Sequence, residues 1–418
     1  MGCQLWSVDV RQCAREKHPM LVTMRVSPIR LSAALLSLTL LTPAFAGGAG
    51  GPRALMPDFS AVTPWPIDCH AAPTLTDGCR LRVPIPAGTM LPTTGQFKIV
   101  PGTNQLTVLY RAAAGTGRPI LCCGLQIPLA PLPSTDVWAA TVKVNNLNRA
   151  VISLQVLTEA YSPLTPTTVW RGPQAPAPVP RPGVLAGQID RFSLTSDSVI
   201  GPRDIRVYTP PRWTNAERLP AVYMADGQAV EEFARTLEAA MARGTAPRVI
   251  LVGISSAQST GVTGSDPLKD HRALEYLEGL PGGAASFAAH EQFVLSMVLP
   301  HVEQTYHLST RPQGRVVAGF SNGAAWAISM AARHPQVFRG VVAMSPGSGG
   351  AQNAPHPATR VFVEAGTLEP LFLNSARTYA ANTRLAGNPT HLEVRVGGHD
   401  EAVWRDVFPS GVAFALNH

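Results

Sequence analysis

A serine between two glycines marks the segment where this chain could do nucleophilic chemistry. Ser321 lies in a Gly-x-Ser-x-Gly pattern that runs from Gly319 to Gly323, between the apolar run GRVVAG and the small-residue stretch NGAAWAISMAARHP. The run predicts a short buried strand, and the stretch predicts a helix that ends near Pro335. A serine on a tight strand-to-helix turn exposes its hydroxyl, and flanking glycines leave that turn uncrowded. We therefore interpret Ser321 as a candidate nucleophile.

A serine hydroxyl needs a base to take its proton, and the base needs an acid to orient it. In α/β-hydrolases the acid follows the serine in sequence and the histidine comes last. Among the histidines beyond Ser321, His399 follows a clear predicted strand, in LEVRVGGHD. That position is the carboxyl end of a strand, where open α/β sheets gather their active-site residues. We expect His399 to be the base.

Two glutamates are candidates for the acid. The segment TRVFVEAGTLEP places Glu364 within a predicted strand and Glu369 in the loop beyond it. The loop position suits a carboxylate that must reach His399, so we expect Glu369 to be the acid. Glu364 is the alternative, and a Ser–His pair without an acid is another. Asp400 and Asp406 are expected to cap or decorate the last helix.

An acyl-transfer site also needs two backbone N–H donors that hold the oxyanion. The residue after the nucleophile, Asn322, is expected to supply the first. The second should come from the turn after an early strand, which is MADGQ in this chain, so Gly227 or Gln228 is predicted there.

The elements that must position these residues fall into two parts. Residues 47–170 predict short strands separated by Gly, Pro and Asn, which favours a small all-β sandwich domain without catalytic residues. Residues 171–186 form a Pro-rich linker. Residues 187–418 alternate buried strands with helices, which predicts a mostly parallel sheet covered on both faces, with a long loop from 255 to 284.

The N-terminal segment predicts export. From Met24 the chain has a positive start, an apolar stretch and the Ala-x-Ala pattern that ends at Ala46. We expect residues 1–46 to be a signal peptide with an upstream extension, a periplasmic or secreted mature protein, and no stable membrane insertion after cleavage. The cysteines beyond the leader are then expected to form disulfides, with all three pairings open: Cys69, Cys79, Cys122 and Cys123.

Composition excludes several other classes of function. The 418 residues are 45% hydrophobic and 15% charged, which fits a globular protein with a large core. The net charge of +7 is spread out, without a basic cluster interleaved with aromatic residues, so nucleic-acid binding is not expected. The cysteines and histidines lack metal-ligand spacing, and no metal or organic cofactor is implied.

Residues from about 190 to 418 resemble the putative-esterase family of α/β-hydrolases, and within it the enterochelin (ferric siderophore) esterases. The matching segments, in the family's order, are VYTPP, YMADGQ, VGISS, RALEY, LPHVEQTYHLST, AGFSNGAA, HPQVFRGVVAMSPGS, EAGTLEP and GGHDEAVW. The segment SNGAA departs from the usual Ser-x-Gly-Gly form. The β-domain also resembles the sandwich that precedes the catalytic domain in enterochelin esterases.

The resemblance implies an α/β-hydrolase domain in which Ser321 is the nucleophile, His399 the base and Glu369 the acid, with Arg272 as a substrate-binding residue. The expected function is a secreted serine carboxylester hydrolase that acts on a small-molecule ester of the siderophore type. The alternatives are a feruloyl or acetylxylan esterase of plant polysaccharides and a non-catalytic binding protein on a hydrolase scaffold.

Overall fold

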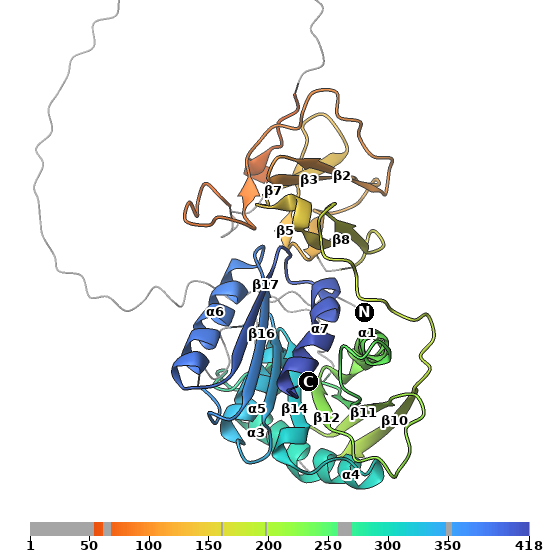
Figure 1. The fold of residues 1–418 in the computed structure, drawn as a ribbon. Coiled ribbons are helices and arrows are strands. Elements are labelled where there is room, and N and C mark those ends of the chain that lie inside the picture. The colour runs from red at the N-terminus through yellow and green to blue at the C-terminus, as the bar shows by residue number, and fades with distance from the viewer. Residues whose placement is uncertain are drawn as a thin grey trace, which may run out of the picture.

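The computed structural model describes residues 54–61, 68–159, 162–196, 199–257, 270–347 and 353–417. The predicted signal peptide lies outside these residues. The described chain forms an antiparallel β-domain (from residue 54 to Arg171) and an α/β domain (from Gln188 onward), stacked one above the other (Figure 1). The α/β domain contains the predicted catalytic residues and is called the catalytic domain below. This architecture confirms the predicted fold class.

Two antiparallel sheets face each other in the β-domain. One has the order β1-β7-β3-β2, with β6 paired to β7, and the other has the order β5-β4-β8-β9. Inward-facing apolar residues of both sheets share one core, as expected of a sandwich. The strands are β1 (Arg80–Leu81), β2 (Phe97–Gly102), β3 (Gln105–Arg111), β4 (Ile120–Cys123), β5 (Ile127–Pro128), β6 (Ala130–Pro131), β7 (Val137–Lys143), β8 (Val151–Leu157) and β9 (Thr168–Arg171).

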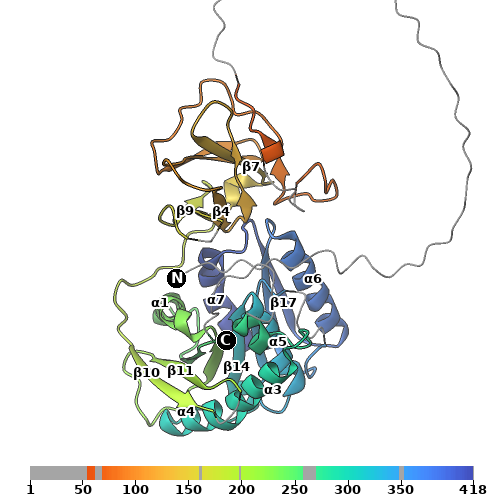
Figure 2. The same cartoon turned by 180° about the vertical axis from the view of Figure 1, so that it is seen from behind.

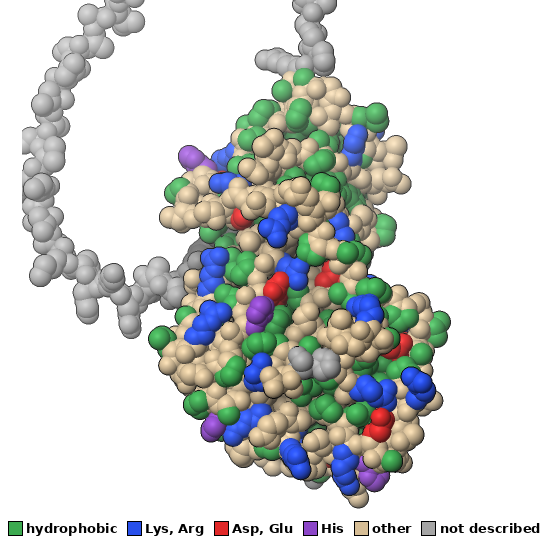
Figure 3. All heavy atoms as spheres, in the orientation of Figure 1, with side chains coloured by type: hydrophobic (Ala, Val, Ile, Leu, Met, Phe, Trp, Pro, Cys, Tyr) green, Lys and Arg blue, Asp and Glu red, His purple; other side chains and the backbone are tan. Residues whose placement is uncertain are grey.

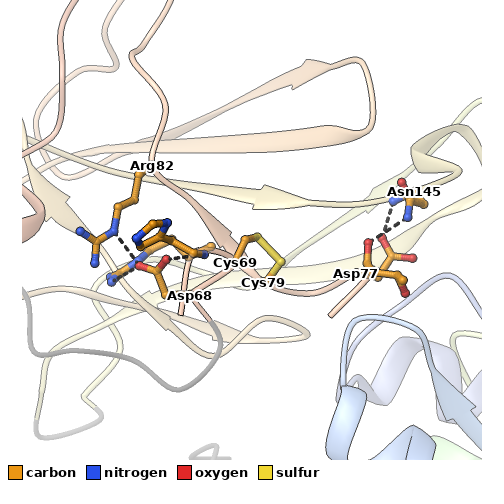
Figure 4. Close-up of a disulfide and its surroundings, with 9 residues drawn as sticks. Asp68, Cys69, Asp77, Cys79, Arg82 and Asn145 are labelled. Atoms are coloured by element: carbon orange, nitrogen blue, oxygen red, sulfur yellow. Dashed lines mark hydrogen bonds and ion pairs between the residues drawn. A yellow bond between two sulfur atoms is a disulfide. The ribbon is translucent and has the colours of Figure 1, made fainter. Parts of the chain in front are cut away.

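Two disulfides lie in the β-domain, and they select one of the three open pairings. Cys69 is bonded to Cys79, which closes a small loop, and Cys122 is bonded to its neighbour Cys123 at the end of β4. Figure 4 shows the first of these beside Asp77, whose carboxylate accepts the backbone N–H of Asn145.

The catalytic domain is built on one eight-stranded sheet of order β10-β11-β13-β12-β14-β15-β16-β17. The edge pair β10–β11 is antiparallel, β11 is antiparallel to β13, and the remaining neighbours are parallel. The strands are β10 (Gln188–Thr195), β11 (Pro202–Thr209), β12 (Ala221–Ala225), β13 (Ile250–Ile254), β14 (Arg315–Phe320), β15 (Gly340–Met344), β16 (Arg360–Gly366) and β17 (Thr390–Arg395).

Helices cover both faces of this sheet, so its central strands are fully buried. Helices α1 (Val230–Ala242) and α7 (Glu401–Ala415) pack together on one face. The other face is covered by α3 (Ala284–Phe293), α4 (Leu299–Thr305), α5 (Asn322–Arg333) and α6 (Pro370–Leu385). Figure 2, seen from behind, shows α1 on one side of the sheet and α6 on the other.

The sequence reading missed two elements of the catalytic domain. Strand β10 alternates exposed and half-buried residues at the sheet edge, so it lacks the apolar run of the central strands. Helix α2 (His271–Tyr276) lies where a continuous loop was predicted, and that prediction is wrong for these residues. The side chain of Asp270 caps α2 by accepting the Ala273 N–H at 2.9 Å, a signal that the sequence did offer.

The Pro-rich segment between β9 and β10 is extended and bonded to the catalytic domain. The Val179 N–H donates to Asp406 at 3.2 Å, and the N–H groups of Ala186 and Gly187 donate to Glu238. In the described part of the chain, no helix has the length and apolar character to cross a membrane. On the face drawn in Figure 3, Lys and Arg side chains are spread over both domains.

Candidate active site

Ser321 lies on a sharp turn between β14 and α5. Its backbone has φ 57° and ψ −126°, a positive-φ conformation that is rare for residues with a side chain. A Cβ at Gly319 would overlap the Gly323 carbonyl, and a Cβ at Gly323 would lie 2.9 Å from the Ala225 Cβ. Both glycines therefore allow the helix to approach the sheet closely, and the turn has the geometry of the predicted nucleophile elbow.

The structure brings His399 and Glu369 together. Nδ1 of His399 lies 2.7 Å from Oε2 of Glu369. The other oxygen of Glu369 accepts the Ser345 hydroxyl and the Gly366 N–H, each at 2.6 Å. This buried carboxylate is thus fixed by donors on both oxygens. With Nδ1–H donating to Glu369, the Nε2 nitrogen of His399 is the one that can accept a proton.

Aromatic rings hold the imidazole of His399 in place. The ring centroid of Phe372 lies 4.2 Å from that of His399, and Trp404 meets His399 edge-to-face at 4.8 Å. Trp404 also stacks on Phe320, the residue before Ser321, with centroids 4.7 Å apart. Its indole N–H donates to the Ser345 hydroxyl at 2.7 Å. Trp404 therefore packs His399 against the end of β14, next to Ser321.

Glu364, the alternative acid, lies in a different environment. Its side chain is fully buried on β16, and neither carboxylate oxygen has a hydrogen-bond partner in the described structure. Burial and the nearby charge of Glu369 raise the pKa of Glu364 well above its usual range. Of the two candidate acids, Glu369 is therefore the one bonded to His399, whereas burial favours the protonated form of Glu364.

The predicted oxyanion donors lie at the same edge of the sheet as Ser321. Strand β12 pairs directly with β14. Gly227 and Gln228 form the turn after β12, and Asn322 is the first residue of α5. The first N–H groups of a helix have no partner within it and favour negative charge. The Gln228 carbonyl accepts from Arg206 at 2.8 Å, which helps to orient this turn.

Arg272 connects the turn after β12 with the turn between β14 and α5. Its Nε and Nη2 each lie 2.7 Å from an oxygen of Asp226, the residue before Gly227, and Nη2 lies 3.4 Å from the Phe320 carbonyl. Burial would lower the pKa of Arg272, but the charge and hydrogen bonds of Asp226 outweigh it and raise that pKa. The predicted substrate-binding role of Arg272 stays a prediction, since this guanidinium already pairs with Asp226.

Three residues of the site were missed by sequence reasoning. Asp226 binds Arg272, Ser345 donates to Glu369, and Trp404 packs on His399. Asp226 and Ser345 each directly follow a sheet strand, so the rule that found Glu369 and His399 could also have found them. In the described ranges, no group of three His, Cys, Asp or Glu side chains is arranged to hold a metal ion.

The family described as "Putative esterase" matches residues 196–415, which is more than half of the chain. The chain belongs to this esterase family. It is thus a carboxylic ester hydrolase, and the matched region contains Ser321, Glu369 and His399.

Solved structures with the same fold cover both domains of this esterase. Enterochelin esterase from Shigella flexneri is 18% identical with a TM-score of 0.58, covering 77% of this chain and 96% of its own. Ferric enterobactin esterase from Salmonella typhimurium is 16% identical with a TM-score of 0.57, covering 77% and 97%. At these identities the likeness shows the fold alone.

Proposed function

We propose that this esterase is an exported serine hydrolase that cleaves a siderophore-type ester through an acyl-enzyme. The observation that carries the mechanism is the 2.7 Å contact between His399 and Glu369, at the sheet edge where the Ser321 elbow lies. Those three residue types in that chain order are the parts of a serine-hydrolase triad.

The proposed reaction uses only residues of this chain. Nε2 of His399 takes the proton of the Ser321 hydroxyl as its oxygen attacks the ester carbonyl carbon. Glu369 stabilises the imidazolium that forms. The Asn322 N–H, together with that of Gly227 or Gln228, receives the oxyanion. The imidazolium then protonates the leaving alcohol, and a water activated by His399 hydrolyses the acyl-enzyme.

The substrate class is proposed from the two-domain likeness. The similar structures titled enterochelin or ferric enterobactin esterases align over nearly their whole length, so the likeness includes the β-domain as well as the catalytic domain. A substrate panel tests this proposal: kcat/KM is measured on a catechol trilactone, feruloyl esters, acetylated xylan and p-nitrophenyl esters. We expect the trilactone to be preferred. A clear preference for feruloyl or acetyl esters would instead make the enzyme a polysaccharide esterase.

Export is proposed from the leader and from the paired cysteines of the β-domain. Both disulfides need an oxidising compartment to persist. Intact mass of the protein recovered from the periplasm or medium should correspond to a chain that starts near Gly47 and has no alkylatable thiol before reduction. A cytosolic, uncleaved protein with free thiols would contradict export without touching the esterase mechanism.

A further inference from the structure

The β-domain contacts the catalytic domain at the loop that carries His399. Figures 1 and 2 show the β-domain seated above β17 and α7. The Val151 N–H, at the start of β8, donates to the Val396 carbonyl at 2.8 Å, and Val151 forms a parallel bridge with Gly397. The backbone of Gly124 packs directly on Gly398, so a Cβ on Gly398 would overlap Gly124. The last residue in this series is Gly398, directly before His399.

Asp400, the residue directly after His399, is held by Ser153 of the β-domain. Its carboxylate accepts the backbone N–H of Ser153 and, at 2.6 Å, the Ser153 hydroxyl. It also accepts the Ala402 N–H at 2.7 Å and so caps α7. Asp400 is fully buried, and these donors compensate for part of its lost hydration. A side chain of one domain thus fixes the residue next to the base in the other.

A second anchor adjoins Glu369. The side chain of Leu368, directly before the acid, is buried within the core of the β-domain and belongs to no other apolar cluster. A Cβ at Gly78 would lie 2.6 Å from the Leu368 carbonyl oxygen, so the loop closed by Cys69 and Cys79 contacts the same residue. Both loops that carry the acid and the base are therefore tied to the β-domain.

We infer that the β-domain is part of the catalytic apparatus, with Ser153 and Leu368 as positioning residues that hold His399 and Glu369 at reacting distance. This inference rests on the proposed serine-hydrolase function. A misplacement of about 1 Å in a catalytic group can cost about 10²-fold in rate. The β-domain should therefore raise kcat on every ester, including small ones that never touch it.

The test compares two buried hydroxyls of the β-domain. Ser153 and Thr165 are each 6% exposed, but the Ser153 hydroxyl donates to Asp400 of the catalytic domain, whereas the Thr165 hydroxyl accepts the Val156 N–H within the β-domain. We expect Ser153→Ala to lower kcat on p-nitrophenyl acetate about tenfold with KM unchanged. Thr165→Val should leave both constants near wild type. Melting temperatures of both variants establish that each is folded at the assay temperature.

Leu368 has an equally matched control. Leu106 lies in the same apolar cluster but on β3, which belongs to the other sheet of the β-domain from the one that contains β8. Leu368→Ala and Leu106→Ala each remove a buried isobutyl group and should lower the melting temperature similarly. Only Leu368→Ala should also lower kcat, because only that residue adjoins Glu369.

A double-mutant cycle of Ser153→Ala with Asp400→Asn, which keeps the helix cap, should show non-additive losses in kcat.

A readout without turnover separates this inference from the proposed function. The Nδ1–H proton of His399, bonded to Glu369, should give a far-downfield proton resonance that broadens or shifts in Ser153→Ala and is retained in Thr165→Val. If the wild-type protein hydrolyses no ester but the resonance changes in Ser153→Ala and is retained in Thr165→Val, the proposed esterase mechanism is rejected and the positioning role is kept. If Ser153→Ala has the same kcat as wild type and an unchanged His399 resonance, the positioning role is overturned, whatever the substrate.

Discussion

The acid–base side and the oxyanion side of the proposed active site are supported in different ways. On the oxyanion side, Arg272 joins Asp226 to the Phe320 carbonyl, so the catalytic domain supports its own turns. On the acid–base side, Ser153 and the core that receives Leu368 belong to the β-domain. One side is therefore complete within one domain, whereas the other depends on the docking of two. Damage to the interface should affect proton transfer before it affects oxyanion binding.

Loss of the acid should cause the largest effect among the supporting residues. Glu369→Gln keeps the shape of the side chain but replaces the anion that accepts the Nδ1–H of His399. We expect kcat to fall by roughly 10²–10⁴, which is less than the loss of the nucleophile. Steady-state kinetics on a p-nitrophenyl ester measure this. A larger loss from Glu364→Gln, in folded protein, would mean that the wrong carboxylate has been assigned.

Loss of Arg272 should have an intermediate effect that arises on the oxyanion side. Arg272→Met removes the bonds to Asp226 and Phe320, and we expect kcat to fall about 10–10²-fold through misplaced donors. The matched control is Arg315→Met, which removes a similar two-nitrogen pairing with Glu303 at the other end of β14. Equal kcat losses in the two variants would show that stability, and not donor placement, explains the effect.

Glu364→Gln should have the smallest effect on rate and a distinctive effect on stability. Burial raises the folded-state pKa of Glu364, so its stabilising contribution is present below its unfolded pKa and is lost as pH rises toward the folded value. Glu364→Gln has no ionisable group at this position, so it does not lose stability in this way as pH rises. We expect kcat within about twofold of wild type and a gain in unfolding free energy relative to wild type as pH rises above the unfolded-state pKa of a glutamate, with a slope of at most about 1.4 kcal/mol per pH unit.

Denaturant unfolding at several pH values measures that gain. A difference between Glu364→Gln and wild type that stays constant with pH would show that Glu364 is ionised in the folded protein.

The parts of this site that follow local rules were predictable from the sequence. Ser321, Glu369 and His399, the residues of the proposed triad, each follow a strand of the parallel sheet in the chain order typical of α/β-hydrolases, so simple strand patterns were enough to select them. The same patterns missed β10, because its edge position removes the apolar run. They also missed α2, since six residues are too few for a clear helical period.

The support for the acid–base side was not predictable from local patterns. Ser153 is one serine in an ordinary strand, and its partner Asp400 lies 247 residues further along the chain. Asp400 was correctly predicted to cap the last helix, but the cap explains only one of its three hydrogen bonds. The other two hydrogen bonds join Asp400 to Ser153 and form only when the two domains are docked. No local pattern around either residue indicates that the two lie close together.

The most direct test of the central claim is covalent labelling of Ser321. The purified protein is treated with a fluorophosphonate, and the adduct is located by peptide mass mapping in wild type and in Ser321→Ala. We predict one adduct, on Ser321, and a loss of ester hydrolysis of several orders of magnitude in folded Ser321→Ala. An adduct on another residue, or near-normal turnover by folded Ser321→Ala, would contradict the serine-hydrolase mechanism.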